Sequence, residues 1–180
     1  TVMDPFHVVR LVGDKVTQCR QRLQQETLGR RGRKNDPLYQ ARRLLLTRNK
    51  LLSETAAPKV DAILQDPQYE ALTRIWSLYQ AVIAAYESPN RTKGRNKLAS
   101  IIDALGAINT KGFPELRSLA RTLRNRRDDI LAYFTHPHSS NGPTEAINGR
   151  LEHLRGIALG FRNLQNYIHR SLLHTGGFKN

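Results

Sequence analysis

The sequence predicts a mainly α-helical protein, a helical bundle with a short strand remnant at its N-terminus. Apolar residues recur three and four positions apart along most of the 180 residues, which is the period of a helix with one buried face. Proline and glycine stand at the ends of these periodic stretches, where helices begin and end. Only residues 1–4 have the pattern of a strand, because an extended apolar run stops directly before Pro5.

The charge of the chain points to a polyanionic partner. There are 29 Lys and Arg residues against 15 Asp and Glu residues, and the net charge is +14. Such a balance favours nucleic acid over a small acidic substrate. Cys19 is the single cysteine, which excludes a disulfide framework and fits a reducing cytoplasm. No run approaches the ~20 apolar residues of a membrane span, so we expect a cytoplasmic protein without a membrane partner.

The first helix is expected from about Phe6 to Leu28, where Gly29 ends it. Cys19 falls on its apolar side, which argues against a reactive thiol. Residues 30–35 then form a basic loop, interpreted either as a solvated linker or as a segment that contacts phosphates. A second helix is expected from Asp36 and Pro37 through Leu52.

Three further helices are expected in the middle of the chain. A short one begins at Pro58 and stops before Pro67, and a longer one covers residues 68–86. The aromatic stripe of the longer helix could stack on bases, but this spacing is more typical of a core. A basic segment from Arg91 to Lys97 then precedes a helix that ends near Ile108.

A long helix is expected from Pro114 to Phe134, with leucines on its buried face and arginines around the rest. Near the end of the chain, Pro143 suits the first position of another helix. Glu145 then lies in the first turn, where backbone N–H groups favour an ionised carboxylate. That carboxylate either binds a metal or merely complements the helix dipole. The last helix is expected from about Phe161.

The acidic residues suggest metal-dependent chemistry on DNA. Asp4 follows the predicted strand, His7 comes close behind it, and Glu145 begins a helix beyond a large basic region. Acids at strand ends and helix starts are typical of nucleases that hold paired Mg²⁺ ions. Two acids do not suffice, so we expect the missing ones on strands upstream of Thr1.

Four segments, in their order along the chain, carry a resemblance to a known family. They are Asp4-Pro5-Phe6-His7-Val8-Val9, Ile130-Leu131-Ala132-Tyr133-Phe134, Ser140-Asn141-Gly142-Pro143-Thr144-Glu145-Ala146-Ile147-Asn148 and Gly160-Phe161-Arg162-Asn163. This series closely resembles the bacterial insertion-sequence transposases of the ISL-three type. The resemblance covers nearly the whole chain, as the C-terminal part of that family's catalytic domain.

The resemblance implies an RNase H-like fold with three acids that bind Mg²⁺ or Mn²⁺. Residues 1–28 would be the end of the last strand and the following helix, residues 29–134 a basic helical insertion, and residues 135–180 the glutamate helix and the C-terminal helix. Glu145 matches the third acid. Asp4 and His7 match an Asp-x-x-His motif, in which Asp4 is either the second acid or an accessory residue.

The chain departs from the family pattern near the glutamate. Ala146 stands where glycine is usual, Glu152 where lysine is common, and Gly156 where arginine is expected. These changes put individual phosphate contacts of that helix in doubt, and less so the catalytic assignment.

Glu145, Asp4 and His7 are the catalytic candidates, Glu145 and Asp4 the metal ligands, and Asn141 and Asn148 supporting residues. The DNA-binding candidates are all basic: Arg30, Arg31, Arg33, Lys34, Arg42, Arg43, Arg121, Arg124, Arg150, Arg155 and Arg162. A homodimer is allowed. The full-length protein would cut transposon ends and join them to target DNA, whereas this chain would be inactive and bind no metal, because an upstream aspartate is missing.

Two other readings stay open at this point. One is a non-enzymatic, basic helical DNA-binding module, derived from a transposase or unrelated to one. The other is a helical scaffold whose basic face binds an acidic protein.

Overall fold

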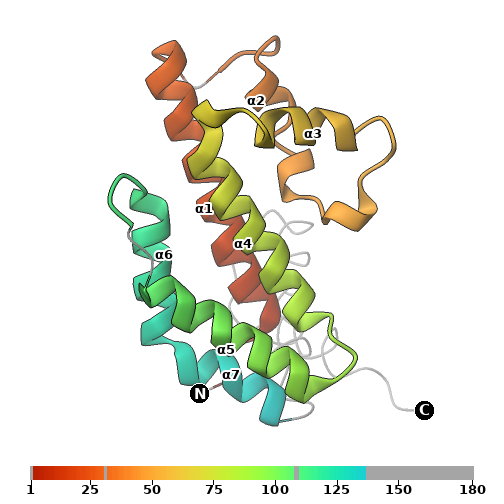
Figure 1. Cartoon of the computed structure of the whole chain (residues 1–180), viewed down its shortest axis with the longest axis vertical. Helices are drawn as coiled ribbons and strands as arrows, with labels where there is room; N and C mark the ends of the chain where they lie inside the picture. The colour runs from red at the N-terminus through yellow and green to blue at the C-terminus, as the bar shows by residue number, and fades with distance from the viewer. Residues whose placement is uncertain (1, 31, 108–109, 137–180) are drawn as a thin grey trace, which may run out of the picture. The chain divides into compact units, whose positions relative to one another are not determined.

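The structure is a computed structural model that describes residues 2–30, 32–107 and 110–136. All of them belong to one compact unit, Thr1–Pro137. Figure 1 shows its helices and short 3-10 turns. In chain order these are α1 (Pro5–Leu28), α2 (Pro37–Gln40), η1 (Leu44–Leu46), η2 (Asn49–Leu51), α3 (Ala57–Leu64), η3 (Pro67–Tyr69), α4 (Glu70–Tyr86), α5 (Arg91–Ala107), α6 (Pro114–Asn125) and α7 (Arg127–Thr135). The prediction of a mainly helical fold is confirmed.

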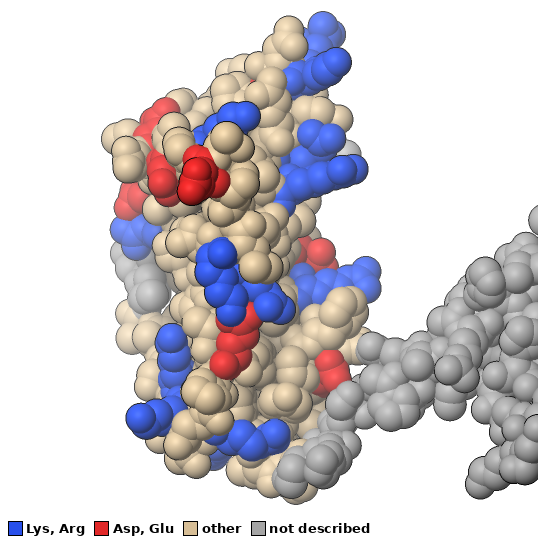
Figure 2. All heavy atoms as spheres, turned by 90° about the vertical axis from the view of Figure 1, so that its right-hand side faces the viewer, with Lys and Arg blue, Asp and Glu red and all other residues tan. Residues whose placement is uncertain are grey.

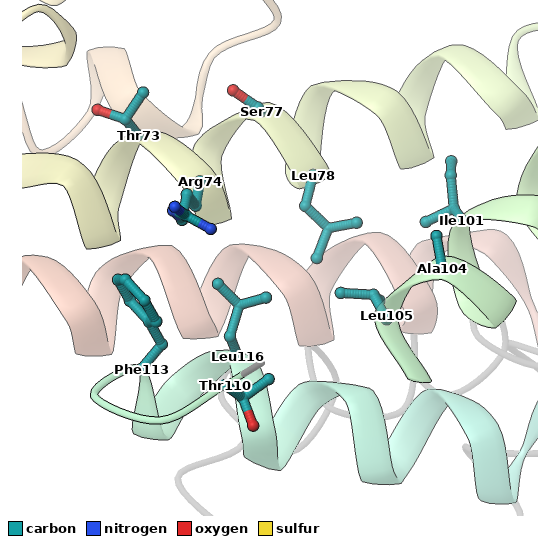
Figure 3. Close-up of a pocket in the computed structure, with 10 residues that line it drawn as sticks. All are labelled: Thr73, Arg74, Ser77, Leu78, Ile101, Ala104, Leu105, Thr110, Phe113 and Leu116. Carbon is teal, nitrogen blue, oxygen red and sulfur yellow. The ribbon is translucent and has the colours of Figure 1, made fainter. Parts of the chain in front are cut away.

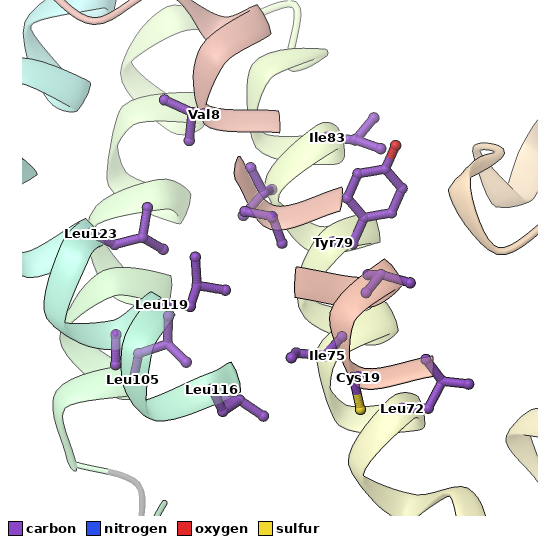
Figure 4. Packing of buried hydrophobic residues seen from close by; sticks show 14 of the residues in the cluster. Val8, Cys19, Leu72, Ile75, Tyr79, Ile83, Leu105, Leu116, Leu119 and Leu123 are labelled. Carbon is purple, nitrogen blue, oxygen red and sulfur yellow. The ribbon is translucent and has the colours of Figure 1, made fainter. Parts of the chain in front are cut away.

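Helices α1 and α4 pack side by side and run in opposite directions (Figure 1). Helix α6 packs on α1, and α5 contacts α4, α6 and α7. Figure 4 shows the side chains that fill the space between these helices, such as Val8 from α1, Ile75 from α4 and Leu119 from α6. Tyr79 and Ile83 are buried in the same cluster, so the apolar stripe of α4 belongs to the core, as its spacing predicts.

Gly94 allows α5 to approach α4 and α7 closely. A Cβ atom at this position would lie 2.6 Å from the carbonyl oxygen of Ala85 and 2.8 Å from a ring carbon of Phe134. Neither atom can move freely, because the first is backbone and the second belongs to a buried ring. Only glycine fits here without displacing one of the two helices.

The strand predicted for residues 1–4 is not formed by the described residues 2–4. A strand needs a partner along its edge, and the described part of the chain offers none. The amide of Met3 instead donates to the carbonyl oxygen of Asp129, 2.9 Å away. Asp4 then caps α1, whose end before Gly29 agrees with the prediction.

The single helix predicted from Asp36 through Leu52 is wrong. Helix α2 ends at Gln40, and the chain continues through turns into η1 and η2. Side chains of α4 donate hydrogen bonds to backbone carbonyl oxygens of this segment. Tyr79 Oη donates to the carbonyl oxygen of Leu46 at 3.0 Å, and Gln80 Nε2 donates to that of Thr47 at 3.1 Å. These tertiary hydrogen bonds replace the helical ones.

The long helix predicted from Pro114 to Phe134 is two helices, because the backbone turns at Arg126, with φ −108° and ψ 14°. The turn lets Ile130, Leu131 and Phe134 of α7 join the core. The basic segment Arg91–Lys97, predicted to precede the helix, instead forms about the first two turns of α5. The side chain of Asn90 accepts from the amide of Lys93 at the start of this helix.

The domain boundaries at residues 28 and 134, which the family resemblance implies, stay a prediction. Within the described residues, α1 shares one core with the helices that follow it. The helices predicted from Pro143 and Phe161 lie outside the described residues.

Candidate nucleic-acid interface

Asp4 and His7 stand at the start of α1. One carboxylate oxygen of Asp4, Oδ1, accepts a hydrogen bond of 2.8 Å from the amide of Phe6, and the residue is 8% exposed. This is the geometry of a helix N-cap. The sequence contains the signal for it, because Pro5 follows at the first helical position. His7 is exposed, with its ring edge-on to that of Phe6.

The structure therefore gives Asp4 a role in stabilising α1, and its metal role stays a prediction. Glu145 lies outside the described residues, as do Arg31, Asn141, Asn148, Arg150, Arg155 and Arg162. Among the residues that the structure describes, no group of three or more His, Cys, Asp or Glu side chains could hold a metal ion.

Cys19 lies on α1 and is fully buried in the hydrophobic core. Burial, with a smaller contribution from Glu115, raises the pKa of its thiol to about 12. A protonated, buried thiol is a poor nucleophile, which agrees with the interpretation of Cys19 as a core residue.

A hydrogen-bonded chain of side chains fixes the base of the basic loop. Arg20, which is only 6% exposed, donates to Gln24 Oε1, and Gln24 Nε2 donates to Asp36 Oδ2. The other oxygen of Asp36 accepts from the amide of Leu38 and caps α2. The backbone of Gly32, with φ 78°, lies close to these hydrogen-bonded side chains, and a Cβ atom at this position would lie 2.1 Å from Gln24 Nε2. These hydrogen bonds join Gln24 of α1, before the loop, to Asp36 at the start of α2, after the loop.

The loop presents three exposed cations, Arg30, Arg33 and Lys34. Arg30 and Arg33 line a hollow of about 610 Å³ at the end of α1, together with Gln68 and Tyr69 of the segment that leads into α4. Burial raises the pKa of Tyr69, so its phenol stays protonated and can donate. Asp36 also lines this hollow, and its two carboxylate oxygens accept hydrogen bonds from Gln24 and from the amide of Leu38. Arg30 and Arg33 are the groups there that can contact an anion.

Arg42 and Arg43 differ from each other. Arg42 is half-buried, donates to the carbonyl oxygen of Tyr39 at 2.8 Å, and lies over the ring of Tyr39. Arg43 is exposed. Of the two candidates, Arg43 is the more exposed.

A second cationic surface lies on α6. Arg117, Arg121 and Arg124 are spaced by four and three residues, so they share one face of the helix. They line a groove of about 510 Å³ with Gly106 at the end of α5 and Thr110 after it. Leu119 and Leu123 of α6 are buried in the core, which fixes the direction of this face. We call this surface the arginine groove.

Arg121 and Arg124 belong to the predicted set, whereas Arg117 was not among the predicted DNA-binding residues. The spacing of the three arginines along α6 is the signal that identifies it. The structure does not place the arginine groove and the basic loop in one hollow, because the two share no lining residue.

Many cations outside these two surfaces are neutralised within the protein. Arg22 pairs with Glu115 at 2.8 Å, Arg48 and Lys50 pair with Glu87, and Arg127 pairs with Asp103. Figure 2 shows acidic side chains among the basic ones on one face of the molecule. By contrast, the described residues place no carboxylate within ion-pair distance of Arg117 or Arg121.

A family model described as a transposase, of the ISL-three group of DDE transposases, matches residues 1–171. No curated protein and no solved structure matches the chain. None of the described helices is long and apolar enough to cross a membrane.

Proposed function

The chain belongs to the ISL-three family of DDE transposases, and we propose that it binds DNA through the arginine groove and the basic loop while the transposase cuts and joins strands. Transposases act on DNA, so family membership makes DNA the partner class. The observation that supports this interface is the groove on α6 lined by Arg117, Arg121 and Arg124, where no described carboxylate lies within ion-pair distance of Arg117 or Arg121.

The proposed binding is electrostatic and mostly independent of base sequence. Guanidinium groups bind phosphate oxygens in a bidentate manner. Each phosphate that they neutralise releases condensed counterions, so the association constant falls as salt rises. If the three groove arginines each bind one phosphate, the slope of log K against log salt is about −3 or steeper.

A titration of the 180-residue chain with a short duplex, at salt concentrations from low to physiological, tests this proposal. Affinity that decreases steeply with salt supports it. Affinity that stays flat over this range contradicts it.

For the chemistry we propose that Glu145 is the third acid of the family's triad and a ligand of the divalent metal ion that DDE transposases generally use. Asn141 and Asn148 would support it. As the resemblance implies, the two aspartates of the triad would come from residues before Thr1, or one of them would be Asp4. When bound, the metal ion would stabilise the attacking and leaving oxygens of the phosphodiester.

The test is strand cleavage by the protein that carries this chain together with the family's aspartates, with Mg²⁺ or Mn²⁺ present. Glu145→Gln should abolish cleavage and leave DNA binding intact. Glu152→Gln is the matched control, because it removes the same charge from the same segment. Unchanged cleavage in Glu145→Gln would remove this residue from the mechanism.

The same assay separates this proposal from a non-enzymatic DNA-binding module derived from a transposase. Such a module would share the salt-dependent binding. It would give no cleavage with either metal, whatever residue stands at position 145.

A further inference from the structure

Three hydrogen-bonded side chains support the basic loop, residues 30–35, and have no part in the function proposed so far. The loop lies between α1 and α2 in the chain (Figure 1). Arg20 and Gln24 of α1 are only 6% and 0% exposed, and Asp36 caps α2. Arg20 Nη1 donates to Gln24 Oε1, and Gln24 Nε2 donates to Asp36 Oδ2, both at 2.5 Å. These bonds connect the helix before the loop to the helix after it.

The chemistry of the three groups allows these hydrogen bonds to run in one direction only. A guanidinium has donors and no acceptor, and a carboxylate has acceptors and no donor. Gln24 lies between the two, so its amide oxygen must face Arg20 and its NH2 group must face Asp36. An amide rotated by 180° would place two donors against each other on one side and two acceptors on the other. Arg20 therefore fixes the orientation of Gln24 towards Asp36.

The loop backbone lies directly against the hydrogen bond between Gln24 and Asp36. A Cβ atom at Gly32 would lie 2.1 Å from Gln24 Nε2 and 2.5 Å from Asp36 Oδ2. Only a residue without a side chain fits there, and its φ of 78° favours glycine as well. Further along the loop, Gln40 Nε2 donates to the carbonyl oxygen of Lys34 at 2.9 Å. Side chains of both flanking helices thus hold the loop backbone in place.

Two cations of the loop flank this anchored backbone. Arg30 precedes Gly32 by two residues and Arg33 follows it by one, and both arginines line the hollow of about 610 Å³ at the end of α1. A cation on a fixed backbone loses less freedom upon binding than a cation on a loosely held one. Resting on the proposed DNA binding, we propose that Gln24 and Asp36 are positioning residues, which hold the loop cations at this hollow for contact with DNA phosphates.

Positioning and simple electrostatics make opposite predictions for Asp36→Asn. The substitution removes a negative charge that lines the hollow, so by charge alone it should tighten DNA binding. Asparagine caps helices as well as aspartate does, and its oxygen can accept from the amide of Leu38 as Asp36 Oδ1 does. Its NH2 group then faces that of Gln24, and the two donors repel. We expect about 3- to 30-fold weaker binding, because the loop cations must now be ordered upon binding.

Gln24→Glu breaks the same hydrogen bond from the other side, because it places two carboxylates against each other. The double variant Gln24→Glu with Asp36→Asn restores the bond in the reverse direction. The asparagine NH2 group donates to the new carboxylate, which still accepts from Arg20. The two changes of charge also cancel. We expect each single variant to bind DNA more weakly and the double variant to recover the wild-type affinity.

Fluorescence anisotropy with a short duplex, at one low salt concentration, measures these affinities on the 180-residue chain. Asp61→Asn is the matched control, because Asp61 is an exposed acid of α3 that lines neither this hollow nor the arginine groove. It should bind at least as tightly as wild type. Tryptic cleavage within residues 30–35, followed by mass spectrometry, measures the order of the loop without DNA. Cleavage should be faster in both single variants than in wild type and the double variant.

Three results would overturn the inference: an Asp36→Asn variant that binds as tightly as wild type or more tightly, a double variant as weak as the single ones, or equal cleavage of the loop in all four proteins. Loss of helical circular dichroism in the single variants would contradict it too, because the inference confines their effect to the loop. None of these results affects the proposed function as long as wild type binds the duplex in a salt-dependent manner. Absence of such binding by wild type would contradict both proposals.

Discussion

Arg22 of α1 donates two hydrogen bonds to Glu115 in the first turn of α6, from Nε at 2.8 Å and from Nη2 at 3.0 Å. The side chain of Glu115 is 9% exposed and that of Arg22 is 25% exposed. This bidentate pair joins the N-terminal helix to the helix that carries the arginine groove. The hydrogen bonds to Glu115 raise the pKa of Arg22, so its guanidinium stays positively charged.

We expect Glu115→Gln to lower the free energy of unfolding by about 1–3 kcal/mol, because it leaves Arg22 without a bidentate partner at a partly buried site. Urea denaturation followed by circular dichroism measures the change. Glu70→Gln is the matched control, since Glu70 forms an exposed pair with Arg74, and such pairs contribute about 0–1 kcal/mol. Equal effects of the two substitutions would show that the Arg22 pair has no special role.

Gly94→Ala should destabilise the protein by about 1–3 kcal/mol, because the added Cβ meets the Ala85 carbonyl oxygen and the Phe134 ring. Gly106→Ala provides the comparison within the same helix. There the new Cβ would meet only the flexible side chain of Arg124, at 3.3 Å or more, and alanine favours the helix. Thermal unfolding of both variants distinguishes them, and a Gly94→Ala protein as stable as wild type would contradict the packing described for α4, α5 and α7.

Cys19 should react with iodoacetamide only when the protein unfolds. Burial raises the pKa of the thiol to about 12, so at pH 8 the folded protein contains almost no thiolate, which is the reactive form. In the unfolded chain the pKa of the thiol returns to near its ordinary value of 9.0, and alkylation becomes faster. Mass spectrometry in native buffer and in urea measures both rates. Rapid labelling of the native protein would contradict the burial of Cys19.

The sequence predicted the parts of the fold that depend on local signals. Helix α1 ends where Gly29 predicts, and the α4 stripe with Ile75 and Tyr79 lies in the core, because periodicity and capping are encoded within a few residues. The prediction is wrong where contacts between residues far apart in the sequence determine the backbone conformation. The segment after Gln40 is not a continuous helix, because side chains of α4 bind its carbonyl oxygens.

The candidate site was predictable to a similar extent. The basic loop, Arg121 and Arg124 are predicted from charge, whereas Arg117 is not among the predicted residues. The sequence does not predict that these two surfaces are separate, nor that a cavity lies beside Phe113 (Figure 3). Both features depend on how α4, α5 and α6 pack. The sequence predicts Asp4 as a metal ligand, and its position before Pro5 also signals the helix cap that the structure shows; the metal role stays a prediction.

The central claim, that the α6 face binds DNA phosphates, is tested most directly by the salt dependence of DNA binding in a double variant, Arg117→Gln with Arg121→Gln. We expect the slope of log K against log salt to become less steep by about 2, because two phosphate contacts are lost. Arg48→Gln serves as the control, since Arg48 pairs with Glu87 and lies outside the groove; this variant should retain the wild-type slope. A double variant with the wild-type slope and affinity would contradict the claim.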